Sequence, residues 1–248
     1  MKPTPDAASS VQVDLRIPGN WANPGEFIKS VPADCRLTPE YLILPDKTRV
    51  EFGMLDADDQ FARIFRTSCR TLPTKEELAI VDGYTVNIVV SGPGGSLQAA
   101  RSLMKGAEAF LRAGGAGVFI DNSGLAHGKQ KWLEMTDDGG PDALSFAFVS
   151  IIRNEIEVFT MGMHVLGLRD IVMKRTDVEI DGFDIIEVIR YMAHNEQPIE
   201  NGHMIGDEDG PRFQVCPTES DEQLSGTAMY NPFGRLKLVS IRDIAETN

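Results

Sequence analysis

Cysteine is scarce in this chain of 248 residues, which has three, at Cys35, Cys69 and Cys216. No C-x-x-C motif occurs, and an odd number of widely separated cysteines would leave one thiol over in any disulfide framework. The chain also lacks an apolar run of about 18 residues, the length that spans a bilayer. Residues 1–10 lack the apolar core of a signal peptide and are predicted to be a disordered tail. These absences predict a reduced, cytoplasmic protein with no membrane partner.

Positive charge is the second shortage. The chain has 24 Lys and Arg against 37 Asp and Glu, a formal net charge of -13 at pH 7. Such a surface repels the phosphates of nucleic acids and anionic lipids, so we expect no nucleic-acid partner. The excess of carboxylates either keeps the protein soluble or serves to bind a basic partner.

The composition is otherwise that of a globular protein, with 42% hydrophobic residues. The clearest pattern is a strand over residues 84–92, a helix over residues 95–113 and a second strand from residue 116. This is a βαβ unit, whose two strands run in the same direction. Further along, residues 146–167 predict a hairpin that turns at Arg153 to Glu155.

Helices and hairpins intermixed with one βαβ unit predict an α+β fold. We expect a mixed, largely antiparallel sheet with helices packed mainly on one face. Residues 11–248 are predicted to form a single domain, in which a glycine-rich break near residues 137–142 could separate two subdomains.

A glycine-rich stretch joins the first strand of this unit to its helix. It reads SGPGGS, and we call residues 92–96 the glycine turn. Backbone N–H groups at a helix N-terminus bind anions when no side chain blocks their approach, so Gly94, Gly95 and Ser96 are candidate ligand-binding residues. The stretch matches neither the Walker A pattern nor G-x-G-x-x-G. The alternative is a tight turn whose glycines only let the helix pack closely.

The loop after the second strand, with the sequence DNSGLAH, adds polar residues at the same edge of the sheet. Ligands favour the carboxyl edge of parallel strands, so Asn122 and Ser123 are further candidate ligand-binding residues. His127 is the candidate catalytic acid or base. No serine here matches G-x-S-x-G, and the alternative is a polar loop that caps the following helix.

Metal-binding patterns are absent from the sequence. The four histidines share no short spacing, and the acidic turn from residue 206 to residue 210 fails the calcium-loop pattern because Thr218, not Glu, stands at the twelfth position counted from Asp207. We therefore predict no metal site and no cofactor, and a simple hairpin turn at residues 206–210.

A longer resemblance lies in the second half of the chain. Gly-Leu-Arg-Asp at residues 167–170, a helix ending near Tyr191, and the turn at residues 201–206 resemble a bacterial family of uncharacterised proteins, domain of unknown function 4261. The resemblance is centred on residues 161–215. It implies a bacterial protein of α+β fold and brings no catalytic residues.

Two functional hypotheses follow. The first is a non-enzymatic binding or interaction protein, whose partner is another protein or a second copy of the chain. The second is an enzyme or sensor that binds a small anionic ligand, carrying a phosphate or carboxylate, at the glycine turn. The second hypothesis requires that the N–H groups of the turn be unpaired and that His127 lie within reach of them.

Overall fold

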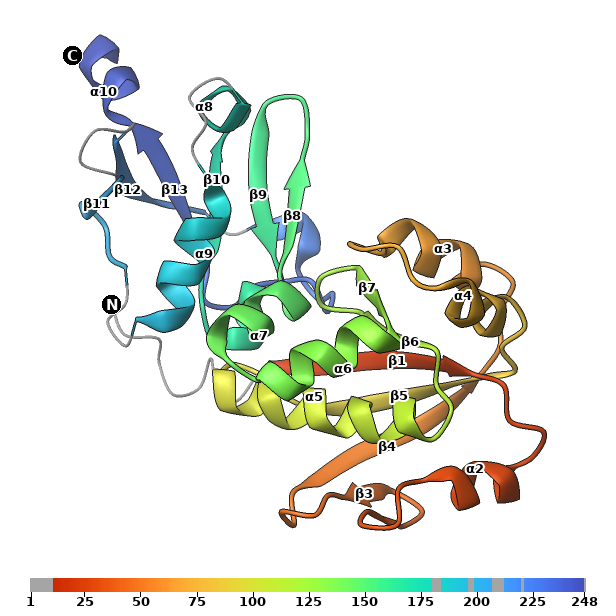
Figure 1. Cartoon of the computed structure of the whole chain (residues 1–248). Helices are drawn as coiled ribbons and strands as arrows, with labels where there is room; N and C mark the ends of the chain where they lie inside the picture. The colour runs from red at the N-terminus through yellow and green to blue at the C-terminus, as the bar shows by residue number, and fades with distance from the viewer. Residues whose placement is uncertain (1–10, 180–183, 196–198, 207–211, 220, 248) are drawn as a thin grey trace.

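The computed structural model describes residues 11–179, 184–195, 199–206, 212–219 and 221–247. The predicted tail, residues 1–10, lies outside the described residues. Two sheets, each flanked by helices, make up the fold (Figure 1). The first sheet has the strand order β2-β3-β4-β5-β1-β6-β7, and the second has the order β11-β12-β13-β10-β9-β8.

The strands of the first sheet are β1 (Gln12–Gly19), β2 (Arg36–Leu37), β3 (Tyr41–Ile43), β4 (Arg49–Asp56), β5 (Val86–Pro93), β6 (Gly117–Ile120) and β7 (Leu125–Gly128). Those of the second are β8 (Ser150–Arg153), β9 (Glu157–Met161), β10 (Asp170–Lys174), β11 (Met204–Gly206), β12 (Arg212–Thr218) and β13 (Arg235–Ser240). The α-helices are α2 (Pro24–Ser30), α3 (Phe61–Ser68), α4 (Lys75–Asp82), α5 (Leu97–Arg112), α6 (Lys129–Asp138), α7 (Pro141–Phe148), α8 (Arg175–Glu179), α9 (Ile185–His194) and α10 (Ile241–Thr247). Two short 3₁₀ helices are η1 (Met163–Leu166) and η2 (Glu222–Leu224).

The predicted α+β class is confirmed, and the pairing is largely antiparallel. Among the described strands, β10 and β13 are the pair that runs in parallel. The strands divide into two sheets where one was expected, because the strands after residue 149 pair with one another rather than with those before residue 129. Residues 137–142, the predicted break, join α6 to α7 between the two sets of strands.

The predicted βαβ unit is present as β5, α5 and β6, but its two strands are not neighbours. β1 lies between them and is antiparallel to both. β5 and β6 therefore run in the same direction, as predicted, with the width of one strand between their carboxyl ends. The helix α5 begins at the N-cap Ser96 and ends before Gly114, whose φ of +117° favours glycine.

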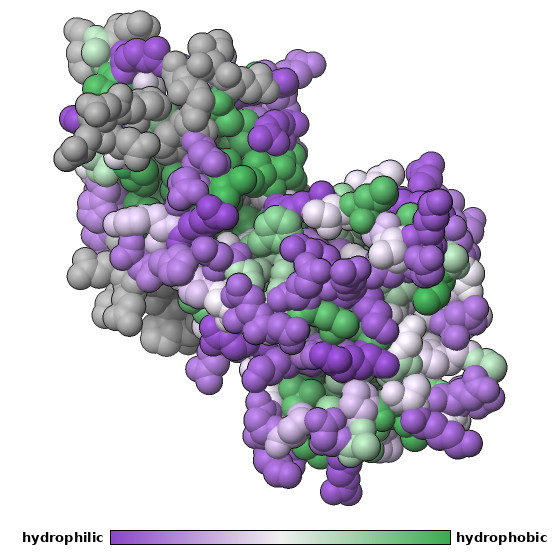
Figure 2. Space-filling model, in the orientation of Figure 1, coloured by the Kyte–Doolittle hydropathy of each residue, from purple (hydrophilic) through white to green (hydrophobic). Residues whose placement is uncertain are grey.

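Helices were expected mainly on one face of the sheet; α5 covers one face of the first sheet, and α3 packs against the opposite face. In β6, Val118 and Ile120 belong to the main hydrophobic cluster, which α5 covers. Phe119 points the other way, because side chains of a strand alternate, and joins a second cluster with Phe61 and Phe65 of α3. The view in Figure 2 shows hydrophilic residues predominating around the first sheet and hydrophobic residues gathered over part of the second.

Candidate functional site

The glycine turn lies at its predicted place, between β5 and α5. Ser96 caps the helix, because its Oγ accepts a hydrogen bond from the N–H of Ala99 at 3.1 Å. The N–H of Gly94 donates to the carbonyl of Val11 at 2.9 Å, and that of Gly95 donates to the carbonyl of Val165 at 3.0 Å. An anion at the turn would have to displace both bonds, so the geometry argues against an anion site here.

The glycines of the turn serve close packing. A Cβ at Gly94 would lie 2.7 Å from the side chain of Val11, and a Cβ at Gly167 would lie 2.4 Å from the carbonyl oxygen of Gly95. Residues 162–167, which include η1, therefore lie directly against the turn, and we call them the wedge segment. This contact favours the alternative interpretation, a tight turn that lets two elements approach each other closely.

The wedge segment also reaches the second predicted loop. A Cβ at Gly162 would lie 2.7 Å from the Cβ of Ser123 and 2.3 Å from the carbonyl oxygen of Phe148. The wedge segment thus touches Gly95 at one end and Ser123 at the other. It occupies the space in which the sequence predicted a ligand cleft.

Asn122 is fully engaged inside the protein. Its side chain is 1% exposed, and its Oδ1 accepts from the N–H of Asp14 at 3.3 Å. Its Nδ2 lies 2.9 Å from the carbonyl of Gln12 and 3.0 Å from the carbonyl of Ala228. These bonds hold three distant parts of the chain together, and they leave Asn122 no free donor for a ligand.

His164 of the wedge segment packs beside Asn122. Its Nε2 lies 3.1 Å from the carbonyl of Ala228, while its buried Nδ1 has no partner among the described residues. Burial lowers the pKa of His164 to about 4, so the ring is neutral at pH 7. The tautomer that donates from Nε2 to Ala228 is favoured, because it leaves only a lone pair unsatisfied at Nδ1.

His127 lies in the core, on β7 rather than in the predicted loop. Its side chain is 0% exposed, and its Nε2 lies 3.0 Å from the carbonyl of Ala147. The rings of Trp132 and Phe146 flank it, and burial lowers its pKa to about 4. A ring enclosed in this way has no access to a ligand in solvent, so the geometry gives no support to a catalytic role.

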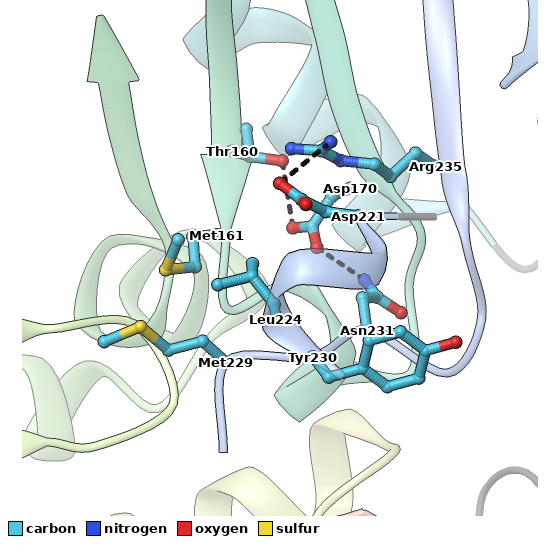
Figure 3. Close-up of a pocket in the computed structure, with 9 residues that line it drawn as sticks. All are labelled: Thr160, Met161, Asp170, Asp221, Leu224, Met229, Tyr230, Asn231 and Arg235. Carbon is cyan, nitrogen blue, oxygen red and sulfur yellow. Dashed lines mark hydrogen bonds and ion pairs between the residues drawn. The ribbon is translucent and has the colours of Figure 1, made fainter. Parts of the chain in front are cut away.

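Asp170, the last residue of the Gly-Leu-Arg-Asp motif, is a buried carboxylate that was not among the predicted site residues (Figure 3). Its Oδ1 accepts from Thr160 Oγ1 at 3.1 Å and from the N–H of Met163 at 3.3 Å, and its Oδ2 accepts from Asn231 Nδ2 at 2.8 Å. Burial raises its pKa to about 6. The adjoining cavity of about 10 Å³ has room for about one water molecule. Asp170 therefore anchors the wedge segment and binds no ligand of larger size here.

A free strand edge is the first exposed feature with recognition potential. In Figure 1, β4 continues past the end of β3. The N–H of Phe52 donates to the carbonyl of Glu40 at 3.2 Å on the β3 side. Backbone groups of a strand alternate between its two sides, so those of Met54 and Asp56 face the same way as those of Phe52. Within the described residues nothing pairs with them there, and we call residues 53–56 the β4 edge.

Acidic and apolar side chains border the β4 edge. Met54 is 49% exposed and Leu55 is 46% exposed. Exposed acidic residues lie close by along the chain, and one follows from the pairing of Phe52 with the residue before β3: Glu51, Asp56, Asp58, Asp59 and Glu40. Charges beside an edge strand can also protect it from unwanted pairing, which is the competing interpretation of this arrangement.

A groove of about 420 Å³ is the second exposed feature. It lies over the solvent-facing side of α5, and we call it the α5 groove. Its volume falls within the roughly 300–1,000 Å³ of small-molecule sites. The residues that line it come from the loop before β2, the β3–β4 turn, α5 and the end of α6: Pro32, Asp34, Cys35, Leu44, Pro45, Asp46, Lys105, Glu108, Ala109, Arg112, Thr136 and Asp137.

Comparisons with protein-family models, with curated proteins and with solved structures give no match. The resemblance to domain of unknown function 4261 therefore stays a prediction. Within the described residues, no three His, Cys, Asp or Glu side chains are placed to hold a metal ion. No helix in that part of the chain combines the length and apolar character needed to cross a membrane. Most of the predicted turn at residues 206–210 lies outside the described residues.

Proposed function

We propose that this protein is a non-enzymatic interaction protein that binds a basic, extended polypeptide segment along the β4 edge. The observation that carries the proposal is that the outward-facing backbone groups of Met54 and Asp56, which carboxylates border, have no partner in the described part of the chain. An extended segment can add to such an edge as a further strand, which gains affinity from main-chain hydrogen bonds and specificity from alternate side chains.

The charge of the surroundings selects the partner. Asp56 lies at the end of the β4 edge, Glu51 lies two residues before its start, and Glu40 immediately precedes β3. Lysine or arginine side chains of an added strand would meet these carboxylates, and the net charge of -13 would attract a basic partner from a distance. A second copy of the chain would place like charges against each other, which disfavours a homodimer through this edge.

A defined peptide tests the proposal. Fluorescence anisotropy would follow a labelled peptide of about eight residues, with valine and lysine in alternation, titrated with the protein. Its counterpart alternates valine with glutamate. We expect the basic peptide to bind, the acidic one not to bind, and the affinity of the basic peptide to fall as salt is raised.

Two variants at Met54 separate backbone pairing from side-chain contact. Met54→Pro removes an N–H that faces away from β5, so it costs no hydrogen bond within the sheet. We expect it to weaken peptide binding about tenfold, whereas Met54→Ala keeps the N–H and leaves binding nearly unchanged. Equal binding of the two peptides, or full binding by a folded Met54→Pro protein, would contradict the proposal.

A further inference from the structure

We infer that the α5 groove binds a small organic cation, a protonated amine or guanidinium carried on an apolar body. The inference concerns a surface distinct from the β4 edge and stands independently of the interaction proposed there. It rests on the shape of the groove and on the balance of charge around it.

The groove combines an apolar floor with a charged rim. Leu44 and Ala109, each 4% exposed, belong to the floor. The charged residues Lys105, Glu108 and Arg112 come from successive turns of α5 and stand beside it. A ligand with an apolar body and a charged end matches this division, because most small-molecule sites are apolar with a few placed polar groups.

Carboxylates outnumber cations around the groove by four to two. Lys105 lies 3.7 Å from Asp46, and Arg112 lies 2.7 Å from Glu108, so each cation already has a carboxylate partner. Among the described residues, this pairing leaves two carboxylates of the groove, Asp34 and Asp137, without an ion-pair partner within salt-bridge distance. An added anion would find no unpaired cation in the groove, whereas an added cation would find both acids.

The electrostatics of Arg112 point the same way. Hydrogen bonding to Glu108 raises its pKa, and the charges of Asp137 and Asp34 add to that effect. One guanidinium therefore faces three carboxylates. This local excess of negative charge is a property of the groove itself, separate from the acidity of the whole chain.

The last turn of α6 contributes Asp137 to the groove, and Thr136 stands beside it. The carbonyl of the C-cap residue Gly139 already accepts a hydrogen bond from Arg101 Nε at 2.8 Å, so the helix end itself is paired with a cation. The negative charge that α6 brings to the groove is therefore the carboxylate of Asp137, which a ligand ammonium group would neutralise.

The experiment is a thermal unfolding series with defined probes. Putrescine, spermidine, agmatine and tyramine are the cations, and 1,4-butanediol and 4-ethylphenol are neutral counterparts of two of them. Inorganic phosphate and acetate are the anions. At concentrations well above the dissociation constant, we expect at least one cation to raise the melting temperature by several degrees, and the neutral compounds and anions to leave it unchanged.

Variants decide whether the α5 groove is the site. Asp34→Asn and Asp137→Asn change exposed carboxyls to amides of the same shape, and each should weaken binding of the active cation about tenfold. Glu155→Gln, on the distant β8–β9 hairpin, removes the same charge and should leave affinity unchanged. The inference is overturned if no cation shifts the melting temperature, or if the shift is the same in all three variants, since the second result means general attraction to an acidic surface.

Discussion

Replacing Gly167 with alanine tests the close contact between the wedge segment and the glycine turn. Gly167 has a φ of +79°, and its new Cβ would lie 2.4 Å from the carbonyl oxygen of Gly95 and 2.9 Å from its carbonyl carbon. These are backbone atoms, which have no rotamer that could move them aside. Gly226→Ala is the matched control, because Gly226 has a φ of +78° and no atom within 4 Å of an added Cβ.

The expected magnitudes follow from the difference between the two sites. Both substitutions force alanine into the left-handed region, at a cost of about 1–2 kcal/mol. Gly167→Ala also overpacks a tight contact, which typically costs a further ~1–3 kcal/mol. We therefore expect Gly167→Ala to lower the free energy of unfolding by about 2 kcal/mol more than Gly226→Ala does.

Urea unfolding, followed by the fluorescence of Trp21 and the buried Trp132, measures both variants against the unchanged protein. The comparison is valid where the dependence of the unfolding free energy on urea is the same in all three proteins. Equal losses in Gly167→Ala and Gly226→Ala would refute the reasoning, because they would mean that no backbone lies close to Gly167.

Three further predictions concern caps and buried charges. Ser96→Ala should lower the free energy of unfolding by about 1 kcal/mol, as measured in urea, because it removes the N-cap of α5. Burial lowers the pKa of His164 to about 4 in the folded protein, against 6.5 in the unfolded chain. The neutral ring therefore contributes its full stability above pH 6.5, and the free energy of unfolding falls as the pH drops from 6.5 toward 4. Between pH 7 and pH 5, the free energy of unfolding measured in urea should therefore fall less for His164→Gln than for the unchanged protein. Asp170 acts in the opposite direction, because its pKa is raised from 3.8 to about 6, so folding gains stability as pH falls through 6 toward 3.8. Asp170→Asn removes this gain, so the free energy of unfolding measured in urea should fall more steeply between pH 6 and pH 4 in the variant than in the unchanged protein. At pH 7 the substitution should lower the free energy of unfolding by about 1–3 kcal/mol, since it sets an amide donor against the amide donor of Asn231.

Local elements of the fold were predictable because their signals lie close together in the sequence. Apolar residues at helical spacing and the cap Ser96 mark α5, and the turn after Arg153 marks the β8–β9 hairpin. The segment 125–128 was predicted as a loop and is the strand β7, because four residues without a β-branched side chain carry too little strand signal. Phe146 was predicted to begin a strand but lies in α7, which Pro141 starts.

The candidate site depended on contacts that no local pattern reports. The glycine turn and the loop at Asn122 lie at one edge of the sheet, as the βαβ pattern predicts, but the wedge segment, which begins 40 residues after Asn122, fills the space between them. His127 was a reasonable acid or base by residue type alone. Its burial comes from the side chains of α6 and α7, which pack over it from outside its own strand.

By itself, then, the amino-acid sequence determined the α+β class, the helix α5 with its cap, and the acidity that directs both proposals toward cationic partners. Capping and periodicity act between residues close in the sequence, and net charge acts over the whole surface, so these signals can be recognised without the tertiary structure. Only the tertiary structure decided that the glycine turn is closed, that no described segment pairs with the outer side of the β4 edge and that the α5 groove is open. Each of these depends on which distant segments come into contact. The free energy of such a contact depends on how two segments fit together, so it cannot be inferred from the sequence of either segment alone.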